Sequence, residues 1–125
     1  MKKIRIGIAG YGNIGRGVEL AVERNTDMEL VAVFTRRDPK TVRILSKNVP
    51  VISMDDLELK KDDIDVMIVC GGSATDLPKM GPAIVKNFNT IDSFDTHAKI
   101  SEYYSSMNEA AEAGGHIGII SVGWD

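Results

Sequence analysis

The sequence has 125 residues, of which 43% are hydrophobic and 26% are charged, and its formal net charge at pH 7 is -3. This length suits one globular domain, and so small a net charge excludes a strong overall attraction to nucleic acid or to an anionic membrane surface. The single cysteine, Cys70, excludes an internal disulfide, and no apolar run has the length of a membrane span or the form of a secretory signal. We therefore expect one cytoplasmic domain.

Strand-like and helix-like periods alternate along the chain, which is typical of a parallel sheet covered by helices. The run IRIGIA (4–9) predicts a first strand, and apolar spacing predicts a helix over 13–24. The inward face of this helix is predicted to carry Ile14, Val18, Ala21 and Val22. The almost wholly apolar run 29–34 predicts a second strand that is buried on both faces.

Residues 36–64 form the least regular part of the chain, with many Lys, Arg and Asp residues. A loop with a short helix near SMDDLEL is predicted there, together with a short third strand at 49–53. The run DVMIVC (65–70) predicts a fourth strand. The charged stretch therefore connects two halves of one sheet.

The same alternation continues to the end of the chain. Pro78 begins a predicted helix, and 90–94 predicts a fifth strand. Ser101 is the predicted cap of a helix that ends at 114–115, and 116–121 predicts a sixth strand. About six strands with crossover helices predict a doubly wound α/β fold, the Rossmann-like dinucleotide-binding fold, in which ligands bind beyond the carboxyl ends of the strands.

A GxGxxG motif lies between the first strand and the first helix, formed by Gly10, Gly12 and Gly15. In a dinucleotide site the first glycine allows a tight turn, the second allows close approach of the pyrophosphate, and the third allows the helix to pack closely on the sheet. The alternative is a glycine-rich turn that binds no ligand. The strand, helix and second strand around the motif favour the dinucleotide site.

The second strand ends in FTRRD, where an NAD site usually has an acidic residue that binds the ribose 2′-hydroxyl. Here Thr35, Arg36 and Arg37 occupy that place. Two guanidinium groups suit a 2′-phosphate through charge-assisted hydrogen bonds, so the sequence favours NADP. The alternatives are that Asp38 turns inward or that this is a solvated charged loop.

The fourth strand is followed by CGGSATD, in which Gly71 and Gly72 let the backbone pass a flat ligand, while Ser73 and Thr75 offer hydroxyls to a nicotinamide ribose. Cys70 is expected to be a small core residue and not a nucleophile. The two histidines have no metal-ligand spacing, so no metal site is predicted.

Taken together, GYGNIGR, FTRRD, CGGSATD, IDSFDTH, MNEAAEAGG and SVGWD resemble the amino-terminal domain of the meso-diaminopimelate D-dehydrogenase family over the whole chain. The resemblance implies an NADP-dependent oxidoreductase of lysine and diaminopimelate biosynthesis. Its reaction is the reversible oxidative deamination of meso-2,6-diaminopimelate at the D-configured carbon, which gives L-2-amino-6-oxopimelate and ammonia.

The resemblance also implies site residues. The cofactor contacts are expected in the loops after three strands: Gly10, Tyr11, Gly12, Asn13, Ile14, Thr35, Arg36, Arg37, Cys70, Gly71, Ser73, Ala74 and Thr75. Asp95 and Asp125 are implied as catalytic carboxylates that bind the substrate together with Trp124. Two carboxylates there suit an ammonium group whose proton must leave before hydride departs. The alternatives are that Asp92 and Asp95 cap the following helix and that Trp124 is a core residue.

In the family the chain continues beyond this point into a substrate-binding and dimer-forming domain. We therefore expect the 125 residues to bind NADP without turning over substrate, and the full-length protein to be a homodimer. One alternative is another NADP-linked oxidoreductase, related to glucose-fructose oxidoreductase and inositol dehydrogenase, although neither Lys79 nor Lys99 lies in the lysine motif expected there. Another is a non-catalytic NADP-binding module. Nucleic-acid binding by the basic residues of 36–47 is disfavoured because the stretch lacks an aromatic platform.

Overall fold

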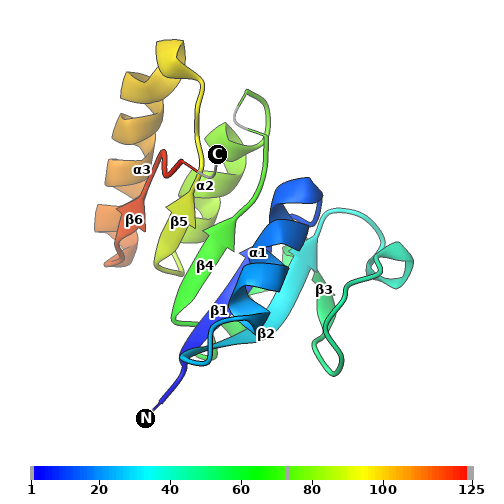
Figure 1. Cartoon of the computed structure of the whole chain (residues 1–125). Coiled ribbons are helices and arrows are strands. Elements are labelled where there is room, and N and C mark those ends of the chain that lie inside the picture. Colours follow the sequence, from blue (N-terminus) through cyan, green and yellow to red (C-terminus); the bar gives the residue numbers. More distant parts are fainter. Residues whose placement is uncertain (1, 73, 124–125) are drawn as a thin grey trace.

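The computed structural model describes residues 2–72 and 74–123, which form one six-stranded parallel sheet with helices on both faces (Figure 1). The strands are β1 (Ile4–Ala9), β2 (Met28–Thr35), β3 (Val51–Ser53), β4 (Val66–Val69), β5 (Thr90–Asp92) and β6 (Gly118–Ile119). The helices are α1 (Asn13–Glu23), α2 (Leu77–Val85) and α3 (Ile100–Gly114), with the short 3-10 helices η1 (Pro39–Thr41), η2 (Met54–Lys60) and η3 (His97–Lys99). The strand order β3-β2-β1-β4-β5-β6 confirms the predicted doubly wound sheet.

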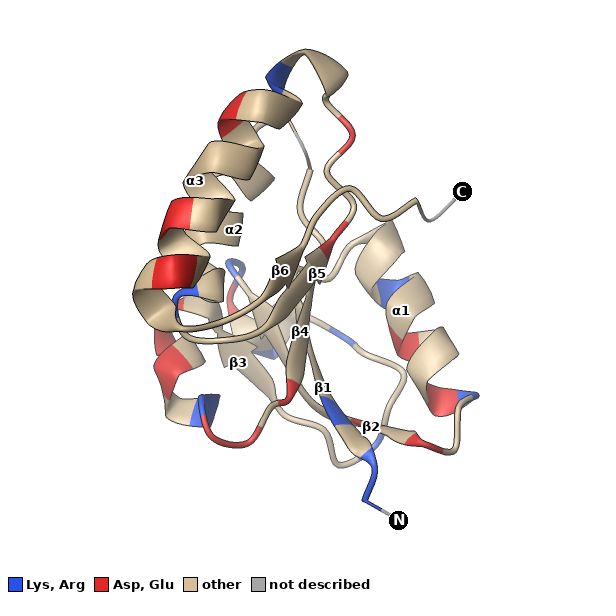
Figure 2. Ribbon diagram, turned by 90° about the vertical axis from the view of Figure 1, so that its left-hand side faces the viewer, with Lys and Arg blue, Asp and Glu red and all other residues tan. Residues whose placement is uncertain are grey.

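The helices divide between the two faces of the sheet, with α1 on one side and α2 and α3 on the other (Figure 2). Each face covers its own apolar cluster. Below α1 the cluster includes Ile8, Val18 and Val33, whereas below α2 and α3 it is larger and includes Phe34 and Phe88. The central strands are therefore apolar on both faces, as their sequences predict.

The inward face of α1 differs from the predicted one. Its buried residues are Gly15, Val18, Glu19 and Val22, whereas Ile14 is 41% exposed and Ala21 is also exposed. Relative to the predicted face, the buried side of α1 is rotated toward Gly15 and Glu19. Gly15 lets the helix approach the glycine loop closely, and backbone and hydroxyl donors bind the Glu19 carboxylate. Apolar periodicity alone predicts the wrong buried face for α1 because one of the buried residues is charged.

The predicted cap at Ser101 is also wrong. The 3-10 turn η3 runs directly into α3, whose N-cap position is Lys99, and Ser101 lies inside the helix. Because Ser101 is already inside α3, it does not occupy the N-cap position from which a hydroxyl caps a helix. At the other end the prediction is confirmed, because Gly115 adopts a left-handed conformation with φ 71° and closes the helix.

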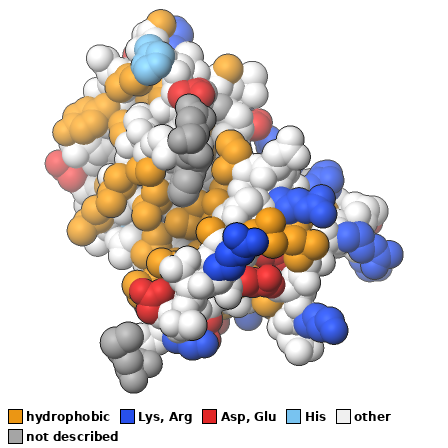
Figure 3. All heavy atoms as spheres, in the orientation of Figure 1, with side chains coloured by type: hydrophobic (Ala, Val, Ile, Leu, Met, Phe, Trp, Pro, Cys, Tyr) orange, Lys and Arg blue, Asp and Glu red, His pale blue; other side chains and the backbone are white. Residues whose placement is uncertain are grey.

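Apolar side chains gather on the α1 side of the molecule, in front in Figure 3. A groove of about 670 Å³ runs there between α1 and the sheet, and its lining includes Ile4, Ile14, Val66 and Ile91. Among the described residues, no helix combines the length and apolar character that a membrane crossing needs.

Candidate functional site

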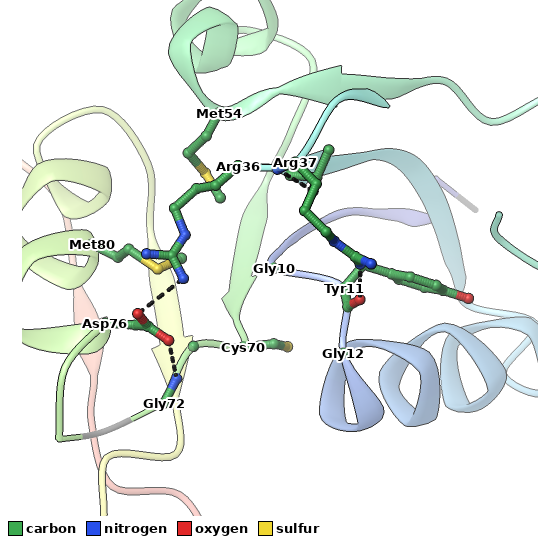
Figure 4. Close-up of a pocket in the computed structure, with 12 residues that line it drawn as sticks. Gly10, Tyr11, Gly12, Arg36, Arg37, Met54, Cys70, Gly72, Asp76 and Met80 are labelled. Carbon is green, nitrogen blue, oxygen red and sulfur yellow. Dashed lines mark hydrogen bonds and ion pairs between the residues drawn. The ribbon is translucent and has the colours of Figure 1, made fainter. Parts of the chain in front are cut away.

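A second cleft of about 670 Å³ lies at the carboxyl ends of β1, β2 and β4, where the strand order reverses direction (Figure 4). In doubly wound sheets this is where ligands bind. The lining of this cleft comprises Gly10, Tyr11, Gly12, Thr35, Arg36, Arg37, Met54, Cys70, Gly71, Gly72, Asp76 and Met80. The structure thus brings together the loops after three strands that are far apart in the sequence.

The glycine loop forms the floor of this cleft between β1 and α1. Gly10 has φ 97°, and a Cβ atom there would lie 2.7 Å from the carbonyl oxygen of Cys70. A Cβ at Gly15 would lie 2.3 Å from the carbonyl oxygen of Gly10, whereas one at Gly12 would meet no described atom within 4 Å. The first and third glycines therefore serve backbone packing, and Gly12 leaves open space at the N-terminus of α1, where an anion is favoured.

Two arginines stand at the end of β2 on the rim of the cleft. The Arg37 guanidinium donates from Nη2 to the carbonyl oxygen of Tyr11 at 2.7 Å, and its backbone N–H donates to the hydroxyl of buried Thr35 at 3.0 Å. Asp38 does not line the cleft, and its carboxylate accepts the Lys40 N–H at 3.0 Å, where it caps η1. The cationic groups, and not the neighbouring acid, face the cleft.

Asp76 is a lining residue that sequence reasoning missed. One of its carboxylate oxygens pairs with Arg36 Nη2 at 2.9 Å, and the other accepts the Gly72 N–H at 3.0 Å (Figure 4). The hydrogen bond from Gly72, followed by that from Arg36, lowers the pKa of the carboxyl. Asp76 therefore joins the loop after β4 to the arginine after β2. The sequence feature that points to Asp76 is an acidic residue just before a predicted helix and a few residues after a double glycine.

Cys70 lies half-buried beside the glycine loop, and burial raises the pKa of its thiol to about 12. A thiol that stays protonated at neutral pH is a poor nucleophile. Its packing against the α1-side apolar cluster agrees with the expected core role.

The remaining expected cofactor residues lie apart from the lining of this cleft. Asn13 and Ile14 line the apolar groove beside α1. Ala74 lines a smaller hollow with Phe94 and Tyr103, and Thr75 is exposed in the turn before α2. Ser73 lies outside the described residues. The roles expected of these residues stay predictions.

Of the expected substrate residues, Asp95 is exposed in the loop after β5, and Trp124 and Asp125 lie outside the described residues. The nearby Asp92 is buried, and its carboxylate accepts hydrogen bonds from the Tyr103 hydroxyl and from the N–H groups of Phe94 at 3.0 Å and Ser121 at 3.1 Å. Asp92 is therefore a structural group that fixes the loop carrying Asp95.

Comparison with known proteins finds a matching family model and relatives of high sequence identity. The family model described as "Dihydrodipicolinate reductase, N-terminus" matches residues 4–69. A meso-diaminopimelate D-dehydrogenase from Ureibacillus thermosphaericus is 66% identical over 125 residues, which are the whole of this chain and 38% of that relative. This chain therefore spans well under half the length of the relative.

Solved dehydrogenase structures are similar over nearly the whole chain. A mutant meso-diaminopimelate dehydrogenase from Clostridium tetani E88, solved with DAP, has 54% identity and a TM-score of 0.87, over 98% of this chain and 38% of that one. An engineered D-amino acid dehydrogenase bound to NADP+ has 40% identity and a TM-score of 0.88, over 99% and 37% of the two chains. The chain belongs to the family of the dihydrodipicolinate reductase N-terminus, and its expected resemblance to the amino-terminal domain of meso-diaminopimelate D-dehydrogenases is confirmed over its whole length.

Proposed function

We propose that this chain is the NADP-binding domain of a dehydrogenase that reversibly deaminates meso-2,6-diaminopimelate to L-2-amino-6-oxopimelate and ammonia. The observation that carries the proposal is the cleft at the ends of β1, β2 and β4, where an open glycine loop faces two arginines. The names of the relatives support the choice of reaction, and the NADP+ bound to the engineered D-amino acid dehydrogenase supports the choice of cofactor.

The residues of the cleft fit this cofactor. A guanidinium carries five N–H donors, so Arg36 and Arg37 retain donors for a 2′-phosphate beside their contacts to Asp76 and Tyr11. The space at Gly12 and the N-terminus of α1 suit the pyrophosphate. When bound, the nicotinamide supplies a hydride acceptor for the substrate carbon.

The proposed chemistry on the protein side belongs to Asp95 and Asp125. One carboxylate binds the substrate ammonium and the other accepts a proton from it. The nitrogen lone pair is then free when hydride leaves the carbon that bears this nitrogen. The resulting iminium is stabilised by the negative charge beside it, and water adds to its carbon before ammonia leaves. Asp95 stands after β5, at the same carboxyl edge of the sheet as the cleft. The full-length protein, with its further residues, is proposed to be a homodimer and to supply the rest of the substrate site.

The first test is a parallel titration of the chain with NADPH and NADH, followed by cofactor fluorescence. We expect NADPH to bind at least tenfold more tightly, a difference of about 1.4 kcal/mol. Arg37→Ala is expected to remove most of that preference, because the 2′-phosphate loses a charged donor. Lys40→Ala is the matched control, since Lys40 is an exposed cation nearby that does not line the cleft. Equal affinity of the wild-type chain for both cofactors would overturn the NADP assignment.

The reaction itself is tested with the full-length protein, by following NADPH formation with meso-2,6-diaminopimelate and NADP. Asp95→Asn is expected to lower kcat by at least a hundredfold while leaving NADPH binding unchanged, since general acid–base groups contribute about 10² to 10⁴ in rate. An Asp95→Asn enzyme with wild-type turnover would contradict the assigned role.

A further inference from the structure

Glu19 is a charged residue of a surface helix, yet it is fully buried in the fold, with 0% of its surface exposed. Its carboxylate accepts the Tyr11 hydroxyl at 2.5 Å, the Ser46 N–H at 2.8 Å and the Leu45 N–H at 3.1 Å. A buried carboxylate is costly unless such donors satisfy it. Burial acts to raise the pKa of Glu19, but these hydrogen bonds outweigh burial and the pKa is lowered, so the group is ionised at neutral pH.

The donors to Glu19 come from two segments, the glycine loop and the segment that follows the two arginines. Tyr11 belongs to the glycine loop and lines the cleft. Leu45 and Ser46 end the segment 36–46, which begins with the two arginines of the rim. Glu19 itself does not line the cleft, so it contacts neither the cleft space nor a ligand placed in it. Its effect on the cleft is exerted through the groups that it binds.

The arginine segment 36–46 is thus tied to the glycine loop at both of its ends. At the first end, Arg37 donates to the Tyr11 carbonyl oxygen at 2.7 Å. At the second end, Glu19 links the Tyr11 hydroxyl to the N–H groups of Leu45 and Ser46. Between the two ends, Asp38 caps η1 and the side chain of Val42 is buried, so the segment is held to the domain along its length as well as at its ends.

We propose that Glu19 is a positioning residue for cofactor specificity: by holding the arginine segment 36–46 against the glycine loop, it keeps the two guanidinium groups facing the ribose 2′ position. This inference rests on the proposed function. It predicts that loss of the Glu19 carboxylate weakens NADPH more than NADH, because only NADPH carries the phosphate that the arginines bind.

The variant Glu19→Gln tests this directly, because it keeps the size of the side chain but places an amide NH2 group among hydrogen-bond donors. We expect its Kd for NADPH to rise at least tenfold, while its Kd for NADH changes by less than threefold. Glu23→Gln is the matched control. Glu23 lies one helical turn further along α1 and accepts the Ser46 hydroxyl at 2.7 Å, but it is exposed, and both of its Kd values are expected to stay at the wild-type level.

Circular dichroism and a urea titration establish that each variant is folded before the binding is measured. If Glu19→Gln does not fold, Tyr11→Phe takes its place, because it removes one donor to Glu19 without leaving a charge unpaired elsewhere; a threefold or greater loss of NADPH preference is then expected. A wild-type chain without NADPH preference overturns the proposed function, and this inference with it. A preference that is kept in Glu19→Gln, or equal losses for both cofactors, overturns this inference alone, because a merely structural role would affect both cofactors alike.

Discussion

Gly15 and Gly17 lie two residues apart in α1 but face opposite surroundings, which makes them a matched pair for testing the packing of the glycine loop. A Cβ at Gly15 would lie 2.3 Å from the Gly10 carbonyl oxygen, whereas one at Gly17 would meet no described atom within 4 Å. Alanine in place of glycine stabilises a helix interior by about 0.5 to 1 kcal/mol, and this gain is common to both variants. Gly17→Ala is therefore expected to stabilise the domain by that amount.

Gly15→Ala carries an additional steric cost. Real Cβ contacts essentially never fall below 3.0 Å, so the helix or the loop must shift by about 0.7 Å, and overpacking of this kind costs about 1 to 3 kcal/mol. The difference between the two variants isolates this cost, because the gain in helix propensity cancels. In urea denaturation it corresponds to a midpoint difference on the order of 1 M. Gly15→Ala should also weaken NADPH binding, since the displaced Gly10 belongs to the cleft, and Gly17→Ala should not.

Equal urea midpoints for the two variants would contradict this reasoning. The Gly10 carbonyl would then move away from the added methyl group with no loss of stability, and close packing would not be the reason for a glycine at position 15.

Two further predictions concern buried carboxylates. Tyr103→Phe removes a hydroxyl that donates to buried Asp92, and it is expected to lower the free energy of unfolding by about 1 to 3 kcal/mol in urea denaturation, while Tyr104→Phe, which alters an exposed ring, should change it by less than about 0.5 kcal/mol. Because the folded-state pKa of Glu19 lies below its ordinary value of 4.5, its contribution to stability is complete above that pH and is lost as the pH falls through the folded value. The urea midpoint of the wild-type chain should therefore fall more steeply below pH 4.5 than that of Glu19→Gln. Part of the decrease remains in both proteins, because the pKa values of Asp65 and Asp76 are also lowered. Parallel profiles of midpoint against pH would contradict the role given to Glu19.

The sequence predicts the fold well because apolar runs and glycines have local consequences. All six strands and the three α-helices lie where periodicity places them, with differences at the ends, whereas the 3-10 helices η1 and η3 were not predicted. The loops after β1, β2 and β4 meet as expected for the carboxyl edge of such a sheet. The sequence predicts cofactor-binding roles for Gly12 and the two arginines because glycine and arginine at these positions suit a dinucleotide, and the structure brings all three to one cleft. The strand order itself follows from the crossover connections.

What the sequence does not reveal is which charged residues turn inward. Glu19 is buried while the adjacent Leu20 is 41% exposed, the reverse of what hydrophobicity alone predicts. Its donors, Leu45 and Ser46, lie in the stretch where element boundaries were least predictable. Asp76 and Asp92 were missed as partners for the same reason, because a carboxylate's partners are distant along the chain and only the assembled fold brings them together.

The buried Asp92 has a practical consequence for choosing where to cut the chain. Besides the contacts of its carboxylate, its carbonyl oxygen accepts the Val122 N–H at 2.9 Å, so the stretch after β6 is fastened to the end of β5 by both Ser121 and Val122. A shorter version that stops at Ile119 would take both donors away from Asp92 and expose a carboxylate beside Tyr103. Expression boundaries for a stable nucleotide-binding fragment therefore belong after Val122, even though the last strand ends at Ile119.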